Sequence, residues 1–173
     1  HGHWWQAEHT SQAVVDQMMS RALRALTGGS SDAAAWGRLF RHFNRARGKG
    51  DAGYRPGENI VIKVNFVGLI WRWDSVDPET YTLKNRIDYM NTSPQMMLAL
   101  LRQLVKTVGA READIALGDS LAYFTNEYYR ILHDEFPDVR SLDYQGKFGR
   151  TAMKPSSVPL YWSCRPKECA QDY

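Results

Sequence analysis

Four polar residues of this sequence have the types and spacing of a chemical site. Lys63 and Asn65 lie two residues apart inside an apolar stretch, and Asp119 and Ser120 directly follow Gly118 at the end of another. A lysine ammonium can bind an anion or donate a proton, and a carboxylate can accept a proton or hold a divalent metal. We therefore take Lys63 and Asp119 as candidate catalytic residues, with Asp119 also a candidate metal ligand. Asn65 and Ser120 are candidate ligand-binding residues.

These residues fall at the ends of segments that predict a parallel sheet. Residues 59–67 form a short β-branched run, and residues 114–117 and 139–143 are similar in length and composition. Helical periodicity over residues 94–108 and 125–136 separates the three predicted strands. This alternation predicts parallel pairing with right-handed crossovers, and ligands bind such sheets beside the carboxyl ends of the strands. We expect the four polar residues to converge at that edge.

Each candidate also has a structural explanation. A lysine buried without a partner in an apolar strand costs several kcal/mol, so Lys63 would have to extend from an edge strand into solvent. Asp119 and Ser120 are common residue types in the turn between a strand and a helix, where they cap the helix. The third predicted strand ends at Asp143, which adds a further carboxylate to the same edge.

The residues before the predicted sheet form two helices in this interpretation. A helix over residues 11–27 has an apolar face that includes Met18 and Leu26, and a helix over residues 32–47 has an aromatic stripe. We predict a three-layer α/β fold with a mostly parallel sheet and this N-terminal two-helix extension. The predicted divisions are residues 1–56 for the extension, 57–146 for the α/β core and 147–173 for a loop-rich tail.

The N-terminus offers a rival site. If His1 is the mature first residue, its amino group and the imidazoles of His1 and His3 suit Cu(II). The competing interpretation is an ordinary loop, because helices and parallel strands do not fit the β-sandwich in which such a copper site would be expected.

Two other features point to partners. The insertion over residues 69–91 is long and carries Trp71 and Trp73, so an alternative function is a non-catalytic interaction subunit that docks through this insertion and the tail. The helix over residues 32–47 carries a basic stripe, Arg38, Arg41 and Arg45, that could bind phosphate groups. Such a stripe is more often simply the solvated face of a helix, and because no nucleic-acid-binding module is recognisable we do not expect a nucleic-acid partner.

The composition narrows the classes of protein to which the chain can belong. The chain has 22 Lys and Arg against 19 Asp and Glu, a net charge of +3, and 43% hydrophobic residues, which is typical of a globular protein. No segment is apolar over the ~18–20 residues that a transmembrane helix needs. Neither a G-x-G-x-x-G nor a Walker A motif is present, so a nucleotide cofactor has no support. Cys164 and Cys169 are either free thiols or a local disulfide.

Three motifs in order resemble the bacterial "domain of unknown function 362" family. They are Gly57-Glu-Asn-Ile-Val-Ile-Lys63-Val-Asn65, then Asn91-Thr-Ser93-Pro94 at a helix start, then Ala113-Asp-Ile-Ala-Leu-Gly-Asp119-Ser120. The resemblance implies an α/β domain of largely uncharacterised activity and adds Ser93 to the candidate ligand-binding residues. Ser93 before Pro94 is also a typical helix start, which is its structural explanation.

The same resemblance carries expectations about the whole protein. The His- and Trp-rich start is similar to the extension of exported bacterial members, so we expect a periplasmic or extracellular protein. Family members continue further, so a second part following Tyr173 is expected to complete the sheet and the site. Some relatives are fused to iron–sulfur modules, but this chain has no ferredoxin-type cysteine run. The sequence identifies neither a substrate nor a metal. It also identifies neither a protein partner nor an oligomeric state.

Overall fold

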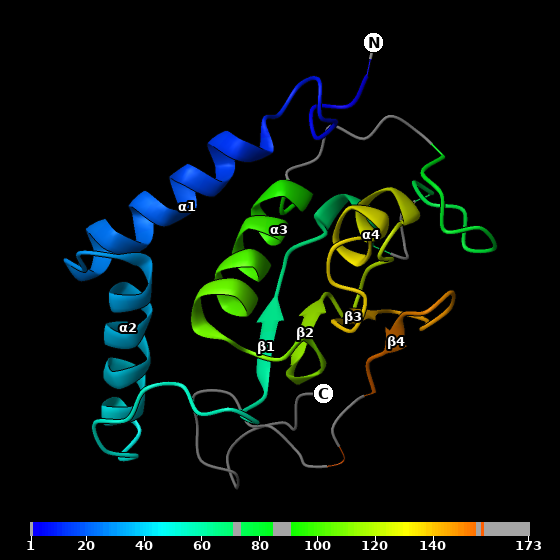
Figure 1. Ribbon diagram of the computed structural model, residues 1–173. Coiled ribbons are helices and arrows are strands. Elements are labelled where there is room, and N and C mark those ends of the chain that lie inside the picture. Colours follow the sequence, from blue (N-terminus) through cyan, green and yellow to red (C-terminus); the bar gives the residue numbers. More distant parts are fainter. Residues whose placement is uncertain (1, 71–73, 85–90, 155–156, 158–173) are drawn as a thin grey trace, which may run out of the picture.

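The structure is a computed structural model of the chain and describes residues 2–70, 74–84, 91–154 and 157. Figure 1 shows a central sheet with two helices in front of it and two further helices on the N-terminal side. The main elements, in chain order, are α1 Gln12–Thr27, α2 Asp32–Ala46, β1 Ile60–Lys63, α3 Pro94–Arg102, β2 Ile115–Gly118, α4 Asn126–His133, β3 Arg140–Asp143 and β4 Thr151–Ala152. Short 3-10 turns at Val67–Leu69 and Glu112–Asp114 and a π-helical segment at Gln103–Val108 join them.

The sheet is parallel throughout and follows the order β1-β2-β3-β4. This confirms the predicted α/β fold with its N-terminal two-helix extension. The fourth strand, β4, was not expected, because it lies in the segment that the sequence predicts to be loop. Two residues are too few to produce a strand pattern; Thr151 and Ala152 are instead fixed by their pairing with Leu142 and Asp143.

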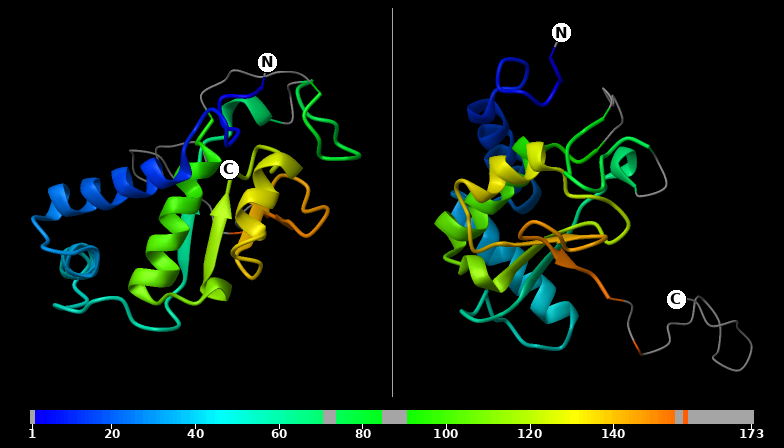
Figure 2. Two further views of the ribbon diagram at one scale, coloured as in Figure 1. Left: turned by 45° about the horizontal axis from the view of Figure 1, so that its top comes forward. Right: turned by 90° about the vertical axis from the view of Figure 1, so that its right-hand side faces the viewer.

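The crossover helices α3 and α4 cover the same face of the sheet (Figures 1 and 2). Consecutive parallel strands joined by crossovers of one hand require this arrangement. On the opposite face Val61 is 68% exposed and Arg140 is also exposed. The third layer that the sequence predicts is therefore not found among the described residues.

The helix ends follow the signals in the sequence. The hydroxyl oxygens of Ser31 and Ser93 each accept the backbone N–H three residues further on, at the starts of α2 and α3. Gly28 and Gly109 adopt the left-handed conformation at the ends of α1 and of the π-helical segment. These four residues fix where the helices begin and end, and so fix the loops that lead to the strand ends.

The core lies between the sheet and the helices α3 and α4. Ile115 and Leu117 of β2 are 0% and 1% exposed. Beyond the ends of the strands, the rings of Phe66 and Phe124 pack edge to face with centroids 5.0 Å apart, and Tyr128 of α4 lies edge-on to Phe66. This aromatic cluster supports the loops that follow β1 and β2.

The apolar face predicted for α1 is largely wrong. Met18 and Leu26 are 61% and 75% exposed, and Leu23 is the buried residue of this helix. The helix lies across the outside of α2 and α3 (Figure 2) and is attached to α3 partly by polar contacts, such as the ion pair between Asp16 and Arg102 at 2.6 Å. Polar contacts of this kind help to hold α1 in place, although several of its apolar side chains are exposed.

Candidate functional site

Three of the predicted residues meet at the carboxyl ends of β1 and β2. The ammonium of Lys63 donates to Oδ2 of Asp119 at 3.1 Å and to Oδ1 of Asn65 at 2.9 Å. It also donates to the carbonyl oxygen of Val64. The convergence that the sequence predicts is therefore present for Lys63, Asn65 and Asp119.

Asp119 is the fixed partner of this group. Its side chain is only 10% exposed, whereas that of Lys63 is 60% exposed. Oδ2 of Asp119 accepts the backbone N–H of Phe66 at 3.1 Å, and Oδ1 accepts that of Leu121 at 3.1 Å. The carboxylate thus ties the loop after β1 to the loop after β2 and presents its charge to the lysine.

Gly118 allows β2 and β3 to lie close together directly before Asp119. A Cβ atom at this position would lie 1.9 Å from the carbonyl oxygen of Leu142 in β3, a distance that no side chain can occupy. Beside it, the backbone N–H of Asp119 donates to the same oxygen at 3.3 Å. The glycine before Asp119 is therefore required by strand packing, independently of any ligand.

Asn65 connects the group to the start of α3. Its backbone N–H donates to Oγ1 of Thr92 at 3.0 Å, and its carbonyl accepts the backbone N–H of Thr92 at 2.8 Å. The next residue, Ser93, caps α3. Its hydroxyl oxygen accepts the backbone N–H of Met96 at 3.0 Å. The structural explanation of Ser93 is thus observed, and no contact of its hydroxyl with Lys63 is found.

Ser120 follows Asp119 directly and forms no hydrogen bond with any described residue. It is half-buried and adjacent in sequence to Asp119, and the described residues leave its hydroxyl and its N–H without an acceptor. The predicted role of Ser120 as a helix cap is not observed, because α4 begins later, after Thr125.

The hydrogen bonds of the group decide which chemistry it favours. An ammonium has three N–H donors, and those of Lys63 meet three acceptors. Oδ2 of Asp119 accepts two hydrogen bonds, from Lys63 and Phe66, and Oδ1 accepts one, from Leu121. In the described part of the chain, no three His, Cys, Asp or Glu side chains lie together as a metal site requires. The ammonium of Lys63 is held by its acceptors and is still exposed to solvent.

A second polar cluster lies at the end of β3, around Asp143, the further carboxylate that the sequence places at this edge. Asp143 is fully buried, and its carboxylate accepts the N–H groups of Phe124, Gln145 and Gly146 at 3.4, 3.0 and 2.5 Å. Arg150 is also buried and donates to the carbonyl oxygen of Phe124. Arg150 lies in the segment predicted to be loop, and no local pattern indicates that it folds back onto β3.

The charges in this cluster are balanced within the protein. Burial lowers the pKa of Arg150, against the attraction of Tyr129 and Asp143. Burial and the charge of Asp143 raise the pKa of Tyr81. The guanidinium also lies 3.8 Å from the centroid of the Tyr129 ring. These side chains are enclosed and serve packing, whereas Lys63 faces solvent.

The N-terminal histidines and the long insertion, which are the other predicted sites, lie partly outside the described residues. His1 lies outside the described residues, and the ring of His3 stacks on that of Trp5 with centroids 4.9 Å apart. In the long insertion, Tyr81 is fully buried in the core. Trp71, Trp73 and Tyr89 lie outside the described residues, as do the cysteines at 164 and 169 and Trp162 in the tail. Docking through the insertion and the tail, and a copper ion at His1 and His3, therefore stay predictions.

The basic stripe of α2 is partly committed to local contacts. Arg38 donates to the carbonyl of Thr27 at 2.8 Å, and Arg45 pairs with Asp51 at 3.0 Å. Both contacts lie at the surface, as expected for the solvated face of a helix.

Comparisons with protein families, curated proteins and solved structures found no match to this chain. The resemblance to the "domain of unknown function 362" family, the export of the protein and a bound metal thus stay predictions. None of the helices in the described segments is both long and apolar enough to cross a bilayer.

Proposed function

We propose that this α/β domain binds a small anionic ligand, with a carboxylate or phosphate group, at the carboxyl ends of β1 and β2. The observation that carries the proposal is the exposed ammonium of Lys63, held by the nearly buried carboxylate of Asp119. A surface lysine ordinarily moves freely, so holding it at the end of a strand has a structural cost that a binding role explains.

The ligand would enter at Asn65. Of the three acceptors around Lys63, the amide oxygen of Asn65 belongs to an exposed side chain, whereas the carbonyl of Val64 and the carboxylate of Asp119 are fixed by the fold. A ligand oxygen replaces the side-chain oxygen of Asn65 as an acceptor for Lys63. The side-chain NH₂ group of Asn65 then donates to the ligand. The unused donors of Ser120 complete the site.

In this proposal Lys63 contacts the ligand, and Asp119 is a positioning residue. A reaction that needs a proton would draw it from Lys63, because both oxygens of Asp119 already accept hydrogen bonds from the protein. Whether the domain turns over its ligand is a separate question from whether it binds, and binding is tested first.

Inorganic phosphate and citrate are suitable first probes. Each is titrated into ¹⁵N-labelled protein while the amide signals of Ser120 and Leu121 are followed. We expect saturable shifts at these amides, and Lys63→Met raises the dissociation constant about tenfold, as the loss of one charged hydrogen bond predicts.

Lys154→Met is the matched control, because Lys154 is an exposed lysine that follows β4, the strand at the opposite edge of the sheet from β1. It leaves the dissociation constant unchanged within twofold. Equal loss in both lysine variants, or shifts that never involve Ser120 and Leu121, would show that the anions bind by net charge and would refute the proposal.

A further inference from the structure

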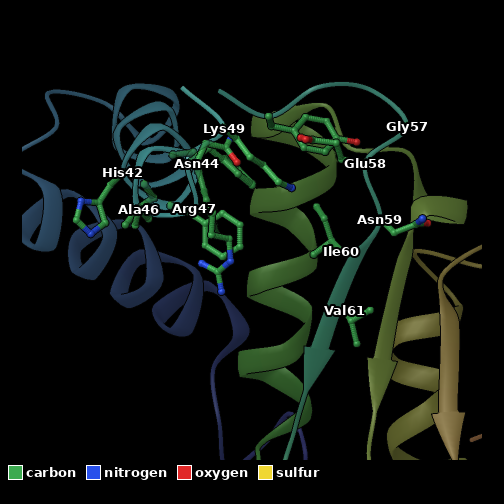
Figure 3. Close-up of a pocket in the computed structure, with 15 residues that line it drawn as sticks. His42, Asn44, Ala46, Arg47, Lys49, Gly57, Glu58, Asn59, Ile60 and Val61 are labelled. Carbon is green, nitrogen blue, oxygen red and sulfur yellow. The ribbon is translucent and has the colours of Figure 1, made fainter. Parts of the chain in front are cut away.

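A large cavity separates α2 from the free edge of β1. It has a volume of about 840 Å³, in the upper range of ligand pockets. One wall is the aromatic stripe of α2 with Trp36, Phe40 and Phe43, and the opposite wall is the start of β1 with Asn59, Ile60 and Val61. Figure 3 shows Asn59, Ile60 and Val61 across the gap from the side chains of Arg47 and Lys49.

Beside this cavity, the edge of β1 carries backbone groups that no described residue pairs. The N–H of Val64 donates to Gly118 in β2, while Asn65 turns its N–H and carbonyl the other way, to Thr92. Because successive residues of a strand alternate sides, the N–H and carbonyl groups of Val61 and Lys63 face away from β2. No described residue bonds to them there. They form a two-residue template for another strand.

The charges of the cavity lining select the partner. The lining has two fixed cations, Arg47 and Lys49, and one carboxylate, Glu58. The carboxylate of Glu58 is already hydrogen-bonded to the backbone N–H of Arg55 at 2.8 Å. The guanidinium of Arg47 lies over the ring of Phe43, 3.7 Å from its centroid, so a positive charge and an apolar surface are presented together.

Three further groups in the lining are either apolar and exposed or polar and without a partner among the described residues. Val61 is 68% exposed and Phe43 is 47% exposed, although both are apolar. The hydroxyl oxygen of Tyr54 is buried and has no hydrogen-bond partner among the described residues. An occupant of the cavity would cover Val61 and Phe43.

We propose that this cavity binds an extended acidic segment of another protein, which adds to the sheet as a strand beside β1. Main-chain hydrogen bonds to Val61 and Lys63 supply affinity, and carboxylates paired with Arg47 and Lys49 supply selectivity. Apolar residues that alternate with the carboxylates cover Val61 and Phe43. This surface shares one residue with the anion site, Lys63, but it uses the backbone of Lys63, whereas the anion site uses its ammonium.

The test uses two synthetic peptides, N-acetylated (Glu-Val)₃-Glu amide and its counterpart with Lys in place of Glu. Each is titrated into ¹⁵N-labelled protein. We expect only the acidic peptide to bind, with the largest shifts at the amides of Val61 and Lys63. The double variant Arg47→Glu/Lys49→Glu weakens binding at least about tenfold. Arg21→Glu, a charge reversal at an exposed residue of α1 outside the lining, changes it less than twofold.

Val61→Pro tests the strand pairing itself, because proline removes an outward-facing N–H and is tolerated on edge strands. It abolishes binding of the acidic peptide, whereas Val61→Thr, which keeps the N–H, does not. If Val61→Pro does not fold, the charge-reversal pair and the amide shifts still decide the question. Equal binding of both peptides, binding unaffected by the charge reversals, or a self-associated protein that ignores the peptides would overturn the proposal.

Discussion

Two aspartates lie at the carboxyl ends of neighbouring strands of the same sheet, and they differ in the partners of their carboxylates. Asp119 follows β2 and Asp143 ends β3, and each accepts the backbone N–H two residues further on, from Leu121 at 3.1 Å and Gln145 at 3.0 Å. Beyond this shared turn they differ: Asp119 pairs with the 60%-exposed side chain of Lys63, whereas Asp143 is 0% exposed and surrounded by protein.

The difference shows that a carboxylate at the end of a parallel strand does not by itself make a site. Asp143 uses its oxygens on three backbone N–H groups and closes the end of β3. Asp119 uses one oxygen partly on a lysine that solvent and ligands can reach. The accessibility of the neutralising cation distinguishes the structural aspartate from the candidate functional one.

The largest effect is expected from Asp143→Ala. This change leaves three N–H groups without their acceptor and removes a charge that attracts the buried Arg150. We expect a loss of about 3–5 kcal/mol in the free energy of unfolding, measured by urea denaturation. Asp143→Asn keeps one oxygen and should cost less. A loss below about 1 kcal/mol for the alanine variant would mean that Asp143 does not hold the end of β3.

Asp119→Ala should cost less stability than Asp143→Ala, about 1–3 kcal/mol. It removes the acceptor of the N–H groups of Phe66 and Leu121, but Lys63 can turn into solvent and remain hydrated. A double-mutant cycle between Asp119→Ala and Lys63→Met should give a coupling of at most about 1 kcal/mol in stability. A coupling as large as that of a buried ion pair would make the Lys63–Asp119 pair structural and remove the contrast with Asp143.

Glu135 provides an intermediate case, a carboxylate that is half-buried and paired with cations. Arg102 contacts it at 2.5 Å, and together with Lys106 it lowers the pKa of Glu135 below the ordinary value of 4.5, despite the opposing effect of burial. A carboxylate with a lowered pKa stabilises the fold above its unfolded pKa, and this contribution disappears as pH falls through the folded value.

Arg102→Met should therefore lower stability by about 1 kcal/mol at pH 7, since both side chains are partly exposed. The variant should also lose less stability than the native protein as pH falls through and below 4.5, because the lowered pKa of Glu135 makes the native carboxylate take up its proton below that ordinary value. Thermal unfolding from pH 7 to below pH 4.5 measures both effects. Parallel stability curves for the two proteins would show that Arg102 is not responsible for the lowered pKa of Glu135.

The sequence predicts the strand-end group well because it depends on topology. Once three strands are known to be parallel, their carboxyl ends must lie at one edge, and Lys63 and Asp119 meet there. The role of Arg150 could not be predicted, because a two-residue strand leaves no periodicity and the contact of Arg150 with Phe124 joins segments 26 residues apart. Nor does a sequence show accessibility, so Asp119 and Asp143 appear equivalent until their cations are located.

The smallest expected effect separates two serines beside the same site. Ser120→Ala removes a hydroxyl that bonds to no described residue, so stability should change by no more than about 0.5 kcal/mol. Affinity for inorganic phosphate should fall by about twofold to fivefold, the loss of one weak donor. Ser93→Ala is the matched control: it removes the cap of α3 and should cost about 1 kcal/mol of stability without changing phosphate affinity. If Ser93→Ala weakens binding and Ser120→Ala does not, the ligand lies at the start of α3, and Asn65 and Thr92 connect it to Lys63.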